Sequence, residues 1–301
     1  IWMGGEIPFI VKDAFLGQNQ MIDMQRAIFL PQNILVSILS TKIHSLIIIS
    51  KIFVFINMVL ITFFSQKIIE ALCIDEKYKP IISFLFIINP IVLYIFFPSW
   101  WNSASAQAWF VGALASILLL RKSFKIKYLI LNVVAVLCIF ADGFPQSVIA
   151  YFFVLVVYLL EMLYRKKYKQ LLVISLVSLG IVLIGLNIYS EYIISSSMTR
   201  RYSSIDNNGN FLKPLLDQIL ITFSPIYYGF MNRFGGYIFT GISIGYSSIY
   251  ILILVCFSKN LKELFKNKNM KFLLSLILVF FVLIQVPEQM GPVRHPFRML
   301  P

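Results

Sequence analysis

The feature that most constrains the fold is a series of eight long apolar runs separated by polar segments. The runs lie at 43–65, 81–97, 104–120, 128–141, 148–163, 171–189, 237–257 and 272–286. Their apolar residues do not alternate with polar ones, which favours membrane-spanning helices over barrel strands. A helix also satisfies its own backbone hydrogen bonds, as lipid requires. The sequence therefore predicts an all-α polytopic bundle of about eight spans, one transmembrane domain over residues 1–301.

Composition agrees with a membrane protein and argues against a soluble one. Hydrophobic residues make up 59% of the chain and charged residues 13%, whereas a soluble domain has about half and a quarter. The formal net charge of +13 would suggest nucleic-acid binding on a soluble protein. Here the basic residues lie mostly in short loops between apolar runs, so we expect a lipid bilayer and no nucleic acid as partner.

Four lysine-rich loops indicate the orientation of the bundle. They are 66–80, 121–127, 164–170 and 258–271. Strict alternation of eight spans places all four on one face, which the positive-inside rule assigns to the cytoplasm. The chain is therefore expected in the plasma membrane as a multi-pass protein. The opposite face receives the segments 1–42, 98–103, 142–147, 190–236 and 287–301.

Two long outward segments are expected to lie on the membrane surface. Within 1–42, the stretch from Ala14 to Leu30 fits an interfacial amphipathic helix that Pro31 would end. The segment 190–236 mixes aromatic and helix-compatible stretches. Because the sequence begins at Ile1 and ends in a proline-rich stretch, we expect it to be a piece of a longer protein, truncated at both ends.

Three outward aspartates are candidate catalytic residues. Asp13 and Asp23 lie in the N-terminal segment, and Asp142 follows an apolar run directly. A carboxylate can serve as a general base or bind a divalent cation. The alternative is a solvated helix face for Asp13 and Asp23, and a helix end in water for Asp142. Whether any metal is bound stays open.

Outward basic residues are candidate substrate-binding groups. Arg200 and Arg201 lie in the long loop, and Arg294, His295 and Arg298 lie within the stretch GPVRHPFRMLP. Arginine binds phosphate through a planar fork of donors and stays charged. These groups could hold a diphosphate or a carboxylate at the membrane surface, or serve only as contacts to headgroups.

Aromatic and amide side chains leave further alternatives open. Trp100, Trp101 and Trp109 fit an aromatic belt at the membrane interface better than a surface that stacks against a sugar or a polyprenyl chain. The amides Asn57, Asn132 and Asn187 lie within the apolar runs. Such amides either bond between helices or line a transport path.

Several enzyme classes gain no support from the sequence. It contains no Walker A motif, no GxSxG, no HExxH and no CxxC. No internal repeat of the kind seen in many secondary transporters is evident.

The outward segments resemble those of a known superfamily. The stretches PFIVKDAFLG, SWWNSASAQ, GFPQS and GPVRHPFRMLP are similar to outward elements of the GT-C polytopic glycosyltransferases, especially bacterial cell-envelope members. The resemblance implies transfer of a sugar from a polyprenyl-phosphate donor to a cell-surface glycan or protein. It also implies an outward carboxylate as base or metal ligand, matched by Asp13, and arginines on the donor phosphate, matched by Arg294 and Arg298.

Two other functions remain open at this stage. One is a transporter or flippase of a lipid-linked saccharide or a small solute. The other is a non-catalytic protein of envelope assembly.

Overall fold

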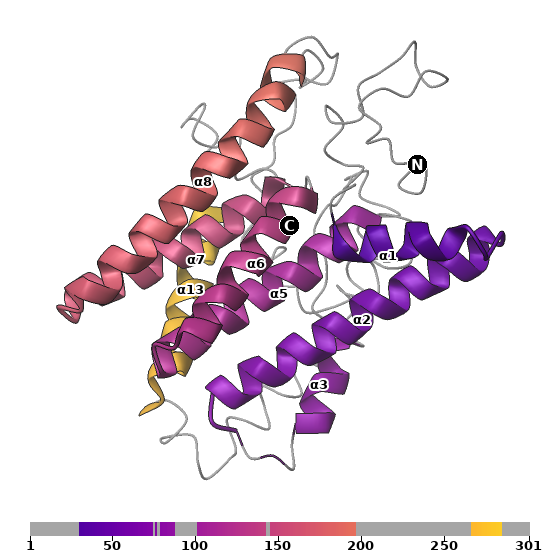
Figure 1. The fold of residues 1–301 in the computed structure, drawn as a ribbon. Coiled ribbons are helices and arrows are strands. Elements are labelled where there is room, and N and C mark those ends of the chain that lie inside the picture. The colour runs from indigo at the N-terminus through magenta and orange to yellow at the C-terminus, as the bar shows by residue number, and fades with distance from the viewer. Residues whose placement is uncertain are drawn as a thin grey trace, which may run out of the picture.

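The computed structural model describes residues 30–74, 76, 79–87, 101–142, 145–196 and 266–284. In this part of the chain the long elements are all α-helices, which confirms the predicted all-α class there. They are α1 (Pro31–Ser40), α2 (Leu46–Ala71), α3 (Lys79–Ile87), α5 (Trp101–Lys122), α6 (Ile126–Asp142), α7 (Pro145–Tyr164), α8 (Tyr168–Ser196) and α13 (Lys268–Ile284) (Figure 1).

Four of the described helices are long and apolar enough to cross a membrane. They comprise Ile47–Ala71, Ala104–Lys122, Ser147–Tyr164 and Tyr168–Gly185. These four match predicted spans, so the chain is a multi-pass membrane protein.

The other predicted spans are matched less completely. The runs 128–141 and 272–286 fall on α6 and α13, which have 17 residues each. This is at the short end for a span, about 17–25 residues. The run 81–97 is described only as far as Ile87, in α3, and 237–257 lies outside the described residues.

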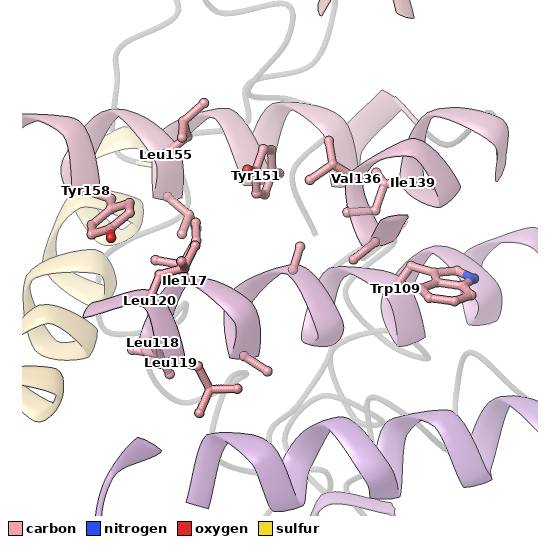
Figure 2. Packing of buried hydrophobic residues seen from close by; sticks show 14 of the residues in the cluster. Trp109, Ile117, Leu118, Leu119, Leu120, Val136, Ile139, Tyr151, Leu155 and Tyr158 are labelled. Carbon is pink, nitrogen blue, oxygen red and sulfur yellow. The ribbon is translucent and has the colours of Figure 1, made fainter. Parts of the chain in front are cut away.

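The helix α5 is the centre of the described bundle. It packs against α2 and α6 along much of its length and also contacts α7 and α13. Its sequence explains this position, because small residues let neighbouring backbones approach closely. The fully buried small side chains of α5 are Ala104, Ser105, Ala106, Ala108, Ala113, Ala115 and Ser116. The buried apolar residues of these helices form one hydrophobic core. Figure 2 shows some of its larger residues, with Trp109 near one end and Tyr158 of α7 near the other.

A short helix begins where the sequence predicted a break. Pro31 is the first residue of α1, a position that suits proline because the first helical N–H has no partner within the helix. Of the interfacial helix expected before it, only Leu30 lies within the described residues. The helix α1 packs on α2 and buries Gln32, while Leu35 and Ile38 are exposed.

The lysine-rich loops meet at one end of the bundle, as far as they are described. Lys122 Nζ donates to the carbonyl of Glu70 at 3.0 Å, and Asn267 Nδ2 donates to that of Leu72 at 2.7 Å. Arg121 in turn binds Glu161 of α7. We call this end of the bundle the basic end. We call the end at which α6 finishes the opposite end.

Candidate functional site

A buried carboxyl group lies at the opposite end of the bundle. Asp142 is the last residue of α6, and α7 begins at Pro145, so only two residues connect the helices. The side chain of Asp142 is 0% exposed. Neither carboxyl oxygen has a hydrogen-bond partner within the part of the chain that the structure describes. The predicted alternative of a helix end in water is therefore wrong for Asp142.

Such a carboxyl group is chemically unusual. An ionised carboxylate in a dry site without a partner is costly, so the group either holds a proton or receives a cation or a donor from a ligand. A carboxyl group within a membrane protein that has no cation or hydrogen-bond donor from its own protein is commonly part of a functional site. Asp142 can therefore act as a proton acceptor or as one ligand of a cation.

Two buried side chains lie close to Asp142 along the chain, one on α6 and one on α7. Cys138, one helical turn earlier on α6, is buried on the same side of the helix. Ser147, in the first turn of α7, is buried as well. Among the described residues no group of three His, Cys, Asp or Glu side chains is placed to hold a metal ion, so Asp142 would have at most one further such ligand from this part of the chain.

Most of the other predicted site residues lie outside the described residues. They are Asp13, Asp23, Trp100, Arg200, Arg201, Arg294, His295 and Arg298. Trp101 is the first residue of α5, but its side chain is not among those described.

Trp109 does not belong to an aromatic belt at the interface. Its side chain is 7% exposed, and its indole Nε1 donates to Gln32 Oε1 at 3.2 Å. Gln32 Nε2 donates to Asn57 Oδ1 at 3.2 Å. This chain of three polar side chains attaches α1 to α2 and α5, and the belt interpretation of Trp109 is wrong.

The midspan amides serve interhelical hydrogen bonds. Asn132 Nδ2 donates to Ser116 Oγ at 2.8 Å and Asn132 Oδ1 accepts from Tyr151 OH at 2.9 Å, which links α6 to α5 and α7. Asn57 also donates to its own helix, at the carbonyl of Phe53. The side chain of Asn187 is not among those described. The two amides that can be judged therefore fit the interhelical interpretation rather than a transport path.

Sequence reasoning missed a network at the basic end that is centred on Arg121. The Arg121 side chain is 4% exposed. Its Nε donates to Glu161 Oε2 at 2.6 Å and its Nη1 donates to Asn269 Oδ1 at 2.6 Å. Arg165, which directly follows the last residue of α7, binds the same carboxylate. One carboxylate thus joins two arginines across α5 and α7.

Asn269 completes this network by binding two helix ends. Its Nδ2 donates to the carbonyl of Ala71, the last residue of α2, at 2.8 Å, and to that of Leu118 in α5 at 3.3 Å. The last carbonyls of a helix lack partners within it, so α13 supplies a donor that the end of α2 needs and also ties α5 to it.

One signal in the sequence did point to the network. Glu161 is the one acidic residue in the apolar run 148–163, and a lone carboxylate near the end of a span needs a cationic partner. The partner, however, lies on α5, and a single sequence does not identify it among 26 lysines and arginines.

Comparison with known proteins places the chain in no family: no family model matches it, and neither a curated protein nor a solved structure matches it.

Proposed function

We propose that the chain is a membrane glycosyltransferase of the GT-C kind, which moves a sugar from a polyprenyl-phosphate donor to a cell-envelope acceptor on the outer face. The observation that carries the proposal is the buried carboxyl group of Asp142, which has no hydrogen-bond partner among the described residues. It lies at the end of the bundle away from the lysine-rich loops. The positive-inside rule assigns that end to the outer face.

The proposed role of Asp142 follows from the chemistry of glycosyl transfer. An acceptor hydroxyl attacks the anomeric carbon of the donor sugar, the bond from that carbon to the donor phosphate breaks, and polyprenyl phosphate leaves. The hydroxyl proton must go to a base, and a carboxylate within hydrogen-bond reach serves this purpose. Asp142, or Asp13 or Asp23 of the N-terminal segment, would be that base. A divalent cation bound by the same carboxylates would instead stabilise the leaving phosphate.

Arginines of the outward segments would hold the donor in this proposal. Arg294 and Arg298 match the positions that the resemblance assigns to the donor phosphate, and Arg200 and Arg201 offer the same chemistry. Trp101 is the first residue of α5, and Trp100 comes directly before it. In this proposal the rings of these two tryptophans would stack on a sugar.

A transporter or flippase of a lipid-linked saccharide is the second candidate. The same observation favours it, because a buried carboxyl group can carry a proton during transport. Asn57 and Asn132 add nothing to this candidate, since both already bind neighbouring helices. A non-catalytic role in envelope assembly would not explain why the carboxyl group of Asp142 is buried without a partner among the described residues.

The test is the variant Asp142→Asn in the full-length protein. Purified wild-type and variant proteins, in vesicles, are supplied with a radiolabelled polyprenyl-phosphate sugar and an envelope fraction as acceptor. We expect the variant to lose at least about a hundredfold in transfer rate, in the range of general-base contributions. Gly180→Ala, at an exposed position of α8 with open space around it, is the control and should transfer normally.

Each outcome of this experiment distinguishes among the three functions. Label that crosses the vesicle membrane without joining the acceptor, in a manner that depends on Asp142, would support the flippase. Equal transfer by the wild type and Asp142→Asn would remove Asp142 from the mechanism. No transfer and no translocation by the wild-type protein would leave the non-catalytic role.

A further inference from the structure

The turn between α7 and α8 has an unusual backbone conformation. The amide of Lys166 donates to the carbonyl of Leu163 at 3.0 Å and the amide of Lys167 donates to that of Met162 at 3.0 Å. This pair of hydrogen bonds is the Schellman motif that ends many helices. The residue at its left-handed position is usually glycine, but here it is Lys166, with φ of 55°.

A lysine at this position is a strained choice. In the left-handed conformation the Cβ atom crowds the following carbonyl, and glycine avoids that contact. Cys73 has the same conformation after α2, with φ of 58°, so the conformation alone assigns no role, but such positions are sometimes kept for function. The Lys166 side chain is exposed and has no hydrogen bond or ion pair within the described part of the chain, so any such role is to be sought at the surface.

The turn carries positive charge that the described part of the protein does not neutralise. Lys166, Lys167 and Lys169 are all exposed. None of them has an acidic partner among the described residues. The carboxylate nearest in sequence, Glu161, already binds Arg121 and Arg165. The three ammonium groups are therefore available to an anion from outside.

Exposed tyrosines and an apolar stripe adjoin these lysines. Tyr164 is 88% exposed and Tyr168 is 59% exposed, one on each side of the charged turn. Tyrosine is enriched at the level of lipid headgroups. From Tyr168 an exposed stripe follows one face of α8 at helical spacing, formed by Leu172, Leu176, Leu179 and Leu183.

We propose that this turn and stripe form a binding site for an anionic phospholipid of the surrounding bilayer. The lipid phosphate receives hydrogen bonds from the ammonium groups of Lys166, Lys167 and Lys169, the tyrosines lie at the headgroup level, and one acyl chain lies along the leucines of α8. The order of these groups along the chain, cations first and aliphatic side chains after them, matches the order of the parts of a phospholipid. The site depends on the membrane location of the chain and not on the glycosyltransferase proposal.

The experiment measures lipid binding to the full-length protein in neutral detergent by native mass spectrometry. Phosphatidylglycerol and phosphatidylcholine of identical acyl chains are titrated separately. We expect clear preference for phosphatidylglycerol in the wild-type protein. The triple variant Lys166→Gln, Lys167→Gln, Lys169→Gln should bind phosphatidylglycerol about a hundredfold more weakly, since each lysine near a lipid phosphate contributes roughly fivefold. The control Lys42→Gln, Lys51→Gln removes two exposed lysines, one before α2 and one within it, and should bind as the wild type does.

A single substitution separates binding from folding. Lys166→Gly relieves the strained conformation, so this variant should unfold at a higher temperature than the wild type while it binds phosphatidylglycerol roughly fivefold more weakly. A purely structural role for Lys166 would not give these two opposite changes.

Two results would overturn the proposal. One is equal phosphatidylglycerol binding by the triple variant and the wild type. The other is complete displacement of phosphatidylglycerol by water-soluble glycerol phosphate at equal concentration, because the site would then recognise a free anion and not a lipid.

Discussion

The guanidinium carbon of Arg121 lies 4.1 Å from the centre of the Phe272 ring. Arg121 is the penultimate residue of the central helix α5, and Phe272 belongs to α13, far along the chain. The same guanidinium binds Glu161 of α7, and Phe272 makes an edge contact with Tyr158 of α7, with ring centres 6.3 Å apart. Arg121 therefore connects α5 to α7 and to α13. The N–H groups of its guanidinium bind Glu161 and its planar face lies on the ring of Phe272, and a lysine offers neither arrangement.

The first prediction concerns this arginine. We expect Arg121→Gln to lower the free energy of unfolding by about 3 kcal/mol, because it leaves the carboxylate of Glu161 with Arg165 alone and removes the hydrogen bond to Asn269. Arg121→Lys should recover less than half of that loss. The measurement is the fraction of protein that stays monodisperse in detergent over a temperature series.

A double-mutant cycle tests whether Arg121 and Glu161 act as a pair. Glu161→Gln alone should destabilise the protein, and the double variant should be more stable than the sum of the two single losses indicates. Strict additivity would show that the ion pair contributes nothing and that packing on Phe272 accounts for the effect.

The second prediction uses two glycines on α8. A Cβ atom at Gly185 would collide with the buried ring of Phe140 on α6, whereas one at Gly180 would meet nothing within 4 Å. Gly185→Ala should therefore cost about 1–3 kcal/mol, as overpacking does. Gly180→Ala should be neutral or should stabilise by up to about 1 kcal/mol. Heat unfolding of the two variants side by side is the measurement, and equal stability would contradict the close approach of α8 to α6.

The third prediction is the same comparison at the centre of the bundle. A Cβ atom at Gly112 would lie 2.8 Å from Cε2 of Phe64. Phe64 is 2% exposed and packs against Trp109, with ring centres 5.7 Å apart, so its ring has little room to move. Gly112→Val should therefore separate α2 from α5 and reduce the yield of folded protein more than Gly185→Ala does. If Gly112→Val is as stable as the wild type, Phe64 moves freely and the packing of α2 on α5 is loose.

The sequence predicted the four spans that the structure shows but not the partners of the polar side chains, for a physical reason. Length and continuous hydrophobicity decide whether a helix can cross a bilayer, and both are local properties, so the runs that became α2, α5, α7 and α8 were recognisable. The partners of a polar group come from other helices. Arg121 counted only as a loop cation, and Trp109 fitted an interface belt until its bond to Gln32 of α1 was known.

The same reason explains the uneven result for the candidate site. Asp142 was identified because it follows an apolar run and precedes a glycine and a proline. Its burial depends on how tightly α7 folds back after α6, which spacing does not reveal. The break predicted at Pro31 agrees with the extended backbone of Leu30, but the sequence did not show that the same proline begins a new helix, a position that suits it.

The fourth prediction separates stability from function at Asp142. Because its oxygens bind no described residue, Asp142→Leu, which removes an unsatisfied buried polar group, should keep or raise the free energy of unfolding by about 1–3 kcal/mol. Stability exchanged for activity in this way is common at functional sites. A large loss of heat stability in the leucine variant would instead assign a structural partner to the carboxyl group.

The last prediction tests the orientation on which an outward site depends. Cys73 is exposed and follows α2 at the basic end, whereas Cys138 is buried within α6. The third cysteine of the chain, Cys256, is replaced by serine. In that background a membrane-impermeant maleimide should leave intact cells unlabelled and should label Cys73 once the membrane is opened. Cys73→Ser in the same background is the control and should stay unlabelled throughout. Labelling of Cys73 in intact cells would place the lysine-rich loops outside and Asp142 on the cytoplasmic side. Asp142 could then not act as the base for sugar transfer on the outer face.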